Sequence, residues 1–162
     1  MIICVIAAVL VFILVNLYRV SDEMSVGVEF NGNTLYFGET ASRVKSDLDT
    51  PNSAEEKPDG VVYCYTGTAY GSLCDTYLTF RGNRLVEATF TISKTDDFGK
   101  FEKVIESVSE VYKSREGYFI TDKATYDSSG YCRISGRSDG AELVCDIYNK
   151  ENVVYIETRA GN

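Results

Sequence analysis

The pattern of apolar and polar residues changes its period along the chain, and each change marks a predicted element. Residues 1–17 are almost continuously apolar. Between residues 26 and 92, short stretches alternate apolar with polar residues, which is typical of half-buried strands. From residue 96 to residue 112, apolar residues recur three and four positions apart and predict a long amphipathic helix. After this helix, apolar and polar residues alternate again as far as residue 158. The pattern predicts an α+β fold in which antiparallel sheet packs against one short and one long helix.

Residues 1–20 are predicted to form a transmembrane anchor, and residues 21–25 a polar linker. The apolar helix would span about 25 Å, slightly less than a hydrocarbon core of about 30 Å, and snorkelling by Arg19 can close the difference. The segment has neither the cationic start nor the small-residue cleavage site of a secretory signal peptide. A cleaved signal and a soluble core helix remain as alternatives. The lipid bilayer is the partner expected for residues 1–20.

Residues 26–94 are predicted to form a first helix-plus-sheet module. A hairpin turns at residues 31–33, and residues 39–48 show the spacing of a short helix that ends before Pro51. Residues 52–60 have the composition of an exposed acidic loop.

The next two strands of this module are predicted to pair as a hairpin with a three-residue loop. This loop places Phe80 opposite Val86. It also places Leu78 opposite Ala88, so that every large apolar side chain lies on one face of the sheet. A two-residue loop would put these side chains on opposite faces, so packing selects the longer loop.

Residues 95–162 are predicted to form a second module, possibly a tandem repeat of the first. Its helix carries an apolar stripe that is better explained as core than as a cofactor site: Phe98, Phe101, Val104, Ile105, Val108, Val111 and Tyr112. The strands that the helix would pack on are expected near residues 118–126, 131–136, 142–148 and 153–158.

Composition and charge exclude several classes of function. The chain of 162 residues has 16 Lys plus Arg against 24 Asp plus Glu, a net charge of −8 and no histidine. Without histidine there is no Ser-His-Asp or Cys-His nucleophile system and no His metal ligand. An acidic chain also lacks the basic surface that phosphate backbones require, so nucleic acid is not an expected partner.

Four of the five cysteines lie in the predicted globular part: Cys64, Cys74, Cys132 and Cys145. An even number in a small domain suits an oxidising compartment, so we expect two local disulfides. The protein is then a single-pass protein of the cell membrane with its domain outside the cytoplasm, although Arg19 opposes this orientation under the positive-inside rule. A bridge between Cys64 and Cys74 closes a short turn-rich loop and would stabilise by about 2 to 3 kcal/mol. Four buried free thiols are the alternative.

The pairing of Cys132 with Cys145 depends on the register of one hairpin. A two-residue loop at Ser138 and Asp139 places the two cysteines directly opposite each other, at a separation that a disulfide tolerates. A turn at Asp139 and Gly140 offsets them instead. The predicted bridge is therefore conditional on the first of these turns.

The tyrosines are the main candidates for partner binding. Four of them cluster around the first predicted disulfide: Tyr63, Tyr65, Tyr70 and Tyr77. Others lie in the last strands: Tyr118, Tyr126, Tyr131, Tyr148 and Tyr155. Tyrosine packs well on half-buried sheets, which is the default explanation, but it is also enriched in binding patches. We expect the loop 65–77, or the outer face of the sheet, to bind a protein partner.

Two motifs resemble catalytic ones without their context. Residues 136–140 match G-x-S-x-G, but strands are predicted on both sides and the chain has no histidine base. Residues 42–45 match S-x-x-K without the companion motifs of penicillin-recognising enzymes. No catalytic residue, cofactor or metal site is predicted, and the chain is expected not to be an enzyme.

The stretch Phe37-Gly38-Glu39-Thr40 begins a short helix that ends near Pro51, and an aromatic hairpin then turns at Gly82. With the order helix, strands, helix, strands, the chain resembles the helix-on-sheet modules of outer-membrane assembly lipoproteins and, as a tandem, the secreted β-lactamase inhibitory proteins. It lacks a lipobox and the Trp-rich surface of such inhibitors. The resemblance implies a fold of the bacterial envelope and a protein-binding role.

The leading hypothesis is a membrane-anchored extracytoplasmic protein-interaction module. One alternative is a structural subunit of a larger membrane or pilus-like assembly, held by the apolar helix. Another is a carboxylate-based hydrolase, which would require two converging Asp or Glu side chains.

Overall fold

The described part of the chain is α+β, as predicted. The computed structural model describes residues 26–93, 98–113, 119–120, 131–138, 141–150 and 153–161. Its elements in chain order are β1 (Gly27–Phe30), β2 (Asn33–Tyr36), α2 (Ala41–Leu48), β3 (Ser53–Lys57), β4 (Gly60–Ala69), β5 (Ser72–Arg81), β6 (Arg84–Ser93), α3 (Phe98–Lys113), β7 (Phe119–Ile120), β8 (Tyr131–Ser138), β9 (Ala141–Lys150) and β10 (Val153–Ala160).

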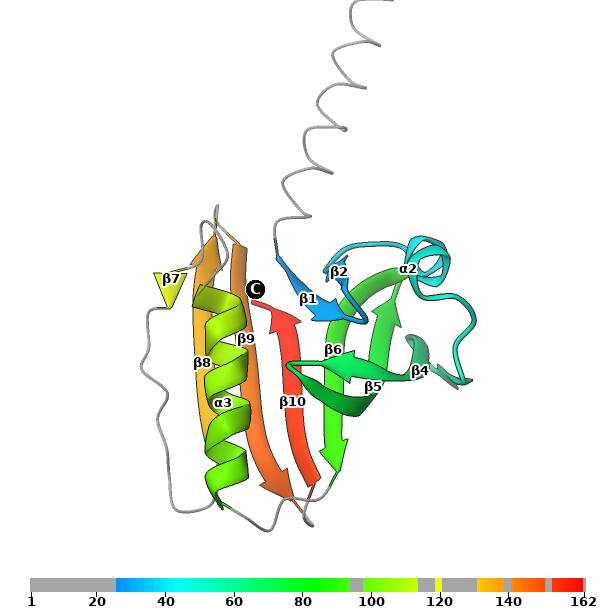
Figure 1. The fold of residues 1–162 in the computed structure, drawn as a ribbon. Helices are drawn as coiled ribbons and strands as arrows, with labels where there is room; N and C mark the ends of the chain where they lie inside the picture. Colours follow the sequence, from blue (N-terminus) through cyan, green and yellow to red (C-terminus); the bar gives the residue numbers. More distant parts are fainter. Residues whose placement is uncertain are drawn as a thin grey trace, which may run out of the picture.

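Eight strands form one antiparallel sheet in the order β3-β4-β5-β6-β10-β9-β8-β7, and β1 pairs with β2 in a separate hairpin (Figure 1). Strand positions repeat along the chain. β5 begins at Ser72 and β9 at Ala141, which is 69 residues later. β6 begins at Arg84 and β10 at Val153, again 69 residues later. The two sets of strands meet where β6 pairs with β10, so the two regions predicted as modules share one sheet.

The predicted first hairpin and short helix are confirmed. β1 and β2 are joined by Asn31 and Gly32, whose φ angles of 50° and 76° are the left-handed values of a tight hairpin turn. Thr40 caps α2, because its side-chain oxygen accepts a hydrogen bond from the backbone N–H of Arg43 at 3.3 Å. Val44, on the helix face toward the core, is fully buried.

The β5–β6 hairpin differs from its prediction by one residue. Leu78 lies opposite Ala88, as expected, but Phe80 lies opposite Leu85 instead of Val86. The turn has two residues, and Val86 is left over as a β-bulge between the paired positions. Because a bulge adds one residue to one strand, the tight turn and the single apolar face are compatible. The prediction considered only regular strands.

The predicted acidic loop at residues 52–60 contains a strand, so that prediction is wrong. Residues 53–57 form β3, which pairs with β4 at one edge of the sheet, and all five of its residues are exposed. Charged residues are also typical of edge strands, because they discourage pairing with other chains. Composition therefore identified the exposure of this segment and missed its pairing.

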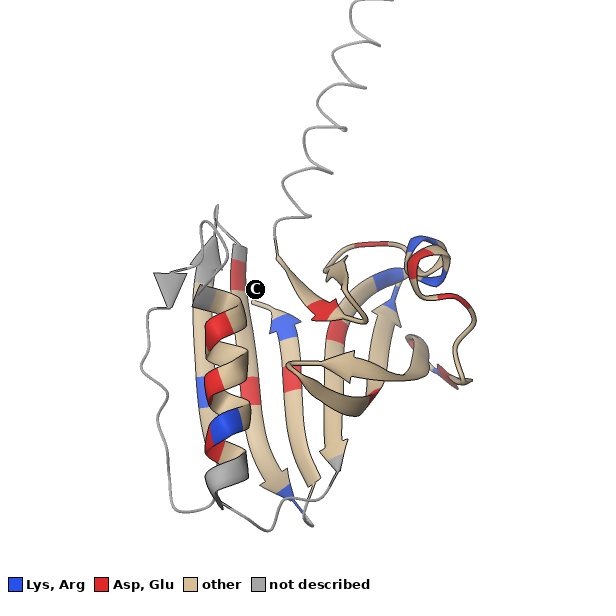
Figure 2. Cartoon of the chain, in the orientation of Figure 1, with Lys and Arg blue, Asp and Glu red and all other residues tan. Residues whose placement is uncertain are grey.

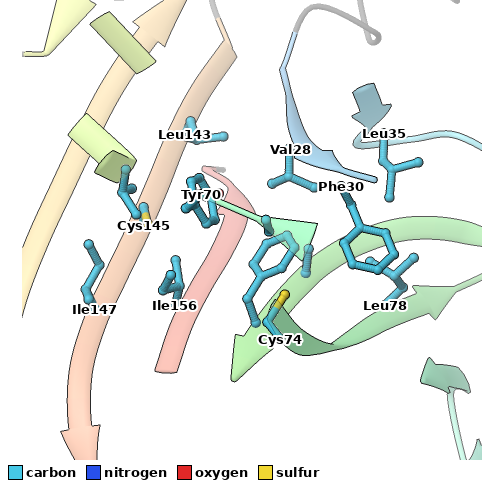
Figure 3. Packing of buried hydrophobic residues seen from close by; sticks show 14 of the residues in the cluster. Val28, Phe30, Leu35, Tyr70, Cys74, Leu78, Leu143, Cys145, Ile147 and Ile156 are labelled. Carbon is cyan, nitrogen blue, oxygen red and sulfur yellow. The ribbon is translucent and has the colours of Figure 1, made fainter. Parts of the chain in front are cut away.

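Helix α3 packs on the sheet through its predicted stripe and lies across β8 and β9 (Figure 1). The buried members of the stripe are Phe101, Val104, Ile105, Val108 and Tyr112. The β1–β2 hairpin packs on the same face, because the rings of Phe30 and Tyr70 both lie against Phe90. The hydroxyl of Tyr70 in turn lies 3.0 Å from that of Tyr112. These residues belong to one hydrophobic core, and Figure 3 shows Phe30 and Tyr70 among its members.

We call the sheet face under α3 and the β1–β2 hairpin the core face, and the opposite one the outer face. Strands β8, β9 and β10 confirm three predicted strands, and of the strand expected at residues 118–126 only β7 is described. Residues 1–20, the predicted anchor, and residues 21–25, the predicted linker, lie outside the described residues. Of the two described helices, neither is both long and apolar enough to cross a membrane.

Candidate functional site

The predicted bridge between Cys132 and Cys145 does not form, and both are free, buried thiols. Cys132 lies opposite Ile147, and Cys145 lies opposite Ile134. This is the offset register, in which Ser138 lies opposite Ala141. Diagonal neighbours of this kind lie about 7 to 8 Å apart, whereas the Cα atoms of a disulfide are usually about 5.5 to 6 Å apart.

The predicted bridge between Cys64 and Cys74 is also wrong. Cys64 lies opposite Tyr77, three positions along β5 from Cys74, which corresponds to about 10 Å. An odd offset also places the two thiols on opposite faces of the sheet. Cys74 is buried in the core (Figure 3), whereas Cys64 is half-buried on the outer face.

We expect four free thiols in the domain of a Cys4→Ser variant. Burial raises the pKa of Cys132 to about 11 and that of Cys145 to about 12, so both stay protonated near neutral pH. In the unfolded chain without reductant, maleimide should add to four cysteines. In the folded chain Cys64 should react first, and the three buried thiols about 100-fold or more slowly, because they need local opening. If intact-mass analysis finds only two adducts, or none, after unfolding, the cysteines are paired in disulfides and the free-thiol prediction is wrong.

The structure places the four candidate tyrosines in different environments. Tyr65 and Tyr70 are buried, with 4% and 7% of their surfaces exposed, so the predicted binding role is wrong for these two. Burial raises the pKa of Tyr65 to about 12. Tyr63 is half-buried on the core face against Phe80, with the Lys45 ammonium 4.1 Å from the centre of its ring. Of the four, Tyr77 alone lies on the outer face, where it is 38% exposed.

The outer face carries further tyrosines from the last strands. The rings of Tyr148 on β9 and Tyr155 on β10 stack with centres 5.0 Å apart and an interplanar angle of 6°. The Tyr148 hydroxyl donates a hydrogen bond to Glu157. Tyr77 lies on the same face with one strand between it and the pair, because Tyr77 is opposite Thr89 on β6 and Tyr155 is opposite Thr91 on β6. Among the described residues, these side chains form an aromatic row that no helix covers.

An ion-pair cluster lies beside this row, and its centre is the carboxylate of Asp146. Arg133 donates to both carboxylate oxygens, at 2.6 Å and 3.0 Å, and Arg159 donates to one of them at 3.0 Å. The Tyr131 hydroxyl donates to the same group at 2.6 Å. Burial alone would raise the pKa of Asp146, but these hydrogen bonds outweigh it and hold the pKa below its ordinary value.

A hollow of about 720 Å³ adjoins the cluster at the end of the sheet where β6 carries its bulge. Arg159 and Val144 belong to its lining, as do Arg81 and Arg84. Two acidic residues also belong to its lining, Glu87 and Glu142. The described residues contain no group of three or more acidic or cysteine side chains placed to hold a metal ion.

The remaining surface features differ from the outer face. The exposed side of α3 is acidic, with Glu102, Glu106 and Glu110 around Lys103 (Figure 2). The G-x-S-x-G match begins inside β8, as a strand and not as a nucleophile elbow. The S-x-x-K match lies in α2, where Lys45 rests on a tyrosine ring.

The Asp146 cluster was not predicted from the sequence. The correct register of the β8–β9 hairpin would have revealed it. In the observed register Arg133 lies directly opposite Asp146, whereas the predicted register would have placed Arg133 opposite Val144. Comparisons with models of protein families, with curated proteins and with solved structures found no match.

Proposed function

We propose that the chain is a protein-binding module, tethered to a membrane by residues 1–20, and that its outer face is the binding surface. The stacked pair of Tyr148 and Tyr155 is the observation that carries this proposal. Rigid aromatic rings on an uncovered face contribute contact area at a low cost in side-chain entropy. Tyrosine and arginine are also the residue types that dominate binding energy in protein interfaces, and Arg133 and Arg159 lie beside the pair.

The partner that we propose is still a protein, but the binding surface lies on the outer face of the sheet. Two of the four tyrosines first considered are buried in the core, which supports the outer face over the loop 65–77 as the binding surface. The outer face, which was the other expectation, joins Tyr77 to tyrosines from β8, β9 and β10. The tether rests on the length and apolar composition of residues 1–17.

The cellular compartment that we propose for the domain is argued from the cysteines and from Arg19. Placement outside the cytoplasm depended on two disulfides, and the four domain cysteines are free thiols in this structure. Buried free thiols are typical of reducing compartments. Arg19 thus becomes the leading topological signal, and under the positive-inside rule it favours a domain in the cytoplasm.

The double variant Tyr148→Ala with Tyr155→Ala should form at least about 90% less of the complex that the full chain forms in its native membrane. Two central aromatic residues of an interface together contribute about 2 kcal/mol or more to the binding free energy. The measurement is the yield of a discrete cross-linked complex on a denaturing gel. The matched control is Glu106→Ala with Glu110→Ala on the exposed side of α3, which should leave that yield unchanged. A double tyrosine variant that melts like the parent chain and retains its complex would rule out this surface.

A further inference from the structure

The two guanidinium groups around Asp146 have unused binding capacity. The side chains of Arg133 and Arg159 are 51% and 39% exposed, while that of Asp146 is 9% exposed. A guanidinium has five N–H donors. Toward the described residues, Arg133 uses two of them on Asp146 and Arg159 uses one. The remaining donors of both groups lie at a solvent-accessible surface.

The cluster brings two positive side chains together in an acidic chain. Two guanidinium groups share one carboxylate, which leaves one positive charge, whereas the whole chain carries −8. Two further acidic groups adjoin the cluster on the same face, and Glu157 lies directly opposite Asp146 in the β9–β10 register. Glu157 accepts a hydrogen bond from Tyr148, and Glu87 lies opposite Arg159 in the β6–β10 register. An anion therefore meets the least repulsion when it approaches from the β8 side, where Arg133 lies.

Asp146 also holds the two arginines in place before any ligand arrives. Its two oxygens bind three N–H groups and one tyrosine hydroxyl, so the guanidinium groups are fixed at one point of a rigid sheet. Fixing long side chains in advance lowers the entropy that binding must cost. Planar guanidinium groups match the geometry of a carboxylate, which they bind through paired hydrogen bonds.

We propose that Arg133 and Arg159, positioned by Asp146, form a receptor for a carboxylate of an acidic protein partner. This inference rests on the proposed function, because it names the group that the outer face recognises. The stacked tyrosines lie alongside and would pack against the stem of the acidic side chain. The partner is thus expected to present Asp or Glu next to an apolar surface.

The test uses small probes on the full chain in detergent, so that it does not depend on finding the partner. N-acetylglutamate α-amide, whose only charge is the side-chain carboxylate, is titrated to tens of millimolar, and N-acetylglutamine α-amide serves as the uncharged probe of nearly the same size. The side-chain Nε–H signals of the arginines are followed by NMR. The signals of Arg133 and Arg159 should shift saturably with the glutamate probe and at least ten-fold less with the glutamine probe. Arg133→Gln should weaken binding at least five-fold. Arg43→Gln, which removes an exposed arginine paired with Asp47 on α2, should not change it.

Equal shifts with the two probes, or no saturable shift, would overturn the carboxylate receptor even if the tyrosine variants abolish a complex. Inorganic phosphate that binds ten-fold more tightly than the singly charged glutamate probe would overturn it as well, because a phosphate-bearing ligand would then fit better. Saturable binding of the glutamate probe supports the receptor even if no protein complex is captured. Failure of this inference and failure of the proposed function are thus separate results.

Discussion

Phe90→Ala is expected to lower the free energy of unfolding by about 3 to 5 kcal/mol. Phe90 is fully buried, and its ring centre lies 6.3 Å from that of Phe30 and 5.3 Å from that of Tyr70. The β1–β2 hairpin, the β4–β5 turn and strand β6 therefore meet at this one ring. Truncation leaves a cavity that three different elements would have to move to fill. Thermal unfolding of the full chain in detergent should show a melting temperature lower by roughly 6 to 20 °C.

The control for this substitution is Leu73→Ala, which removes a large apolar side chain that is 72% exposed. Because little of Leu73 is removed from water on folding, the free energy of unfolding should change by less than about 0.5 kcal/mol. Similar losses for both variants would show that the packing around Phe90 is described incorrectly.

Asp146→Ala is expected to lower the free energy of unfolding by roughly 2 to 3 kcal/mol at pH 7, because it removes the acceptor of four hydrogen bonds. The loss is smaller than for a fully buried ion pair, since water can rehydrate the half-exposed guanidinium groups. Urea unfolding of the full chain measures it. The matched control is Asp75→Ala, an exposed carboxylate on the same face, which should cost less than about 1 kcal/mol.

The contribution of Asp146 should also depend on pH. Because its pKa is lower in the folded chain than in the unfolded one, the carboxylate stabilises the fold above its unfolded pKa of about 3.9. This stabilisation disappears as the pH falls through the folded pKa. The gap in stability between the parent chain and Asp146→Asn should therefore shrink between roughly pH 6 and pH 2. A gap that stays constant over this range would contradict the hydrogen-bonded carboxylate described here.

The spacing of apolar residues predicted an element and its buried face correctly where that spacing continued without interruption. The stripe from Phe101 to Tyr112 predicted which face of α3 is buried, and alternation predicted β8, β9 and β10. The Val86 bulge was missed because alternation assumes regular strands. Strand β3 was missed because an exposed edge strand has no buried face and so no alternating pattern.

The candidate site depended on register, which a single sequence specifies weakly when several turns are possible. The predicted β8–β9 register placed Cys132 opposite Cys145. The observed register differs by a small shift and places Arg133 opposite Asp146. Opposite charges on facing strands stabilise a pairing, so this pair was available as a signal for the correct register. Tyr70 could not be recognised as buried, because its burial results from contacts with Phe90 and Tyr112, which are distant in the sequence.

A photocrosslinking scan of the full chain in its native membrane tests the central claim, that the outer face binds a protein partner. Benzoylphenylalanine is placed at Tyr77 and Thr89, which lie opposite each other on the outer face, and at Glu106 and Glu56, which are exposed on α3 and on β3. The account predicts one discrete crosslinked product from both outer-face positions and none of that size from α3 or β3. A product of the same size from Glu106, with none from Tyr77 or Thr89, would contradict it.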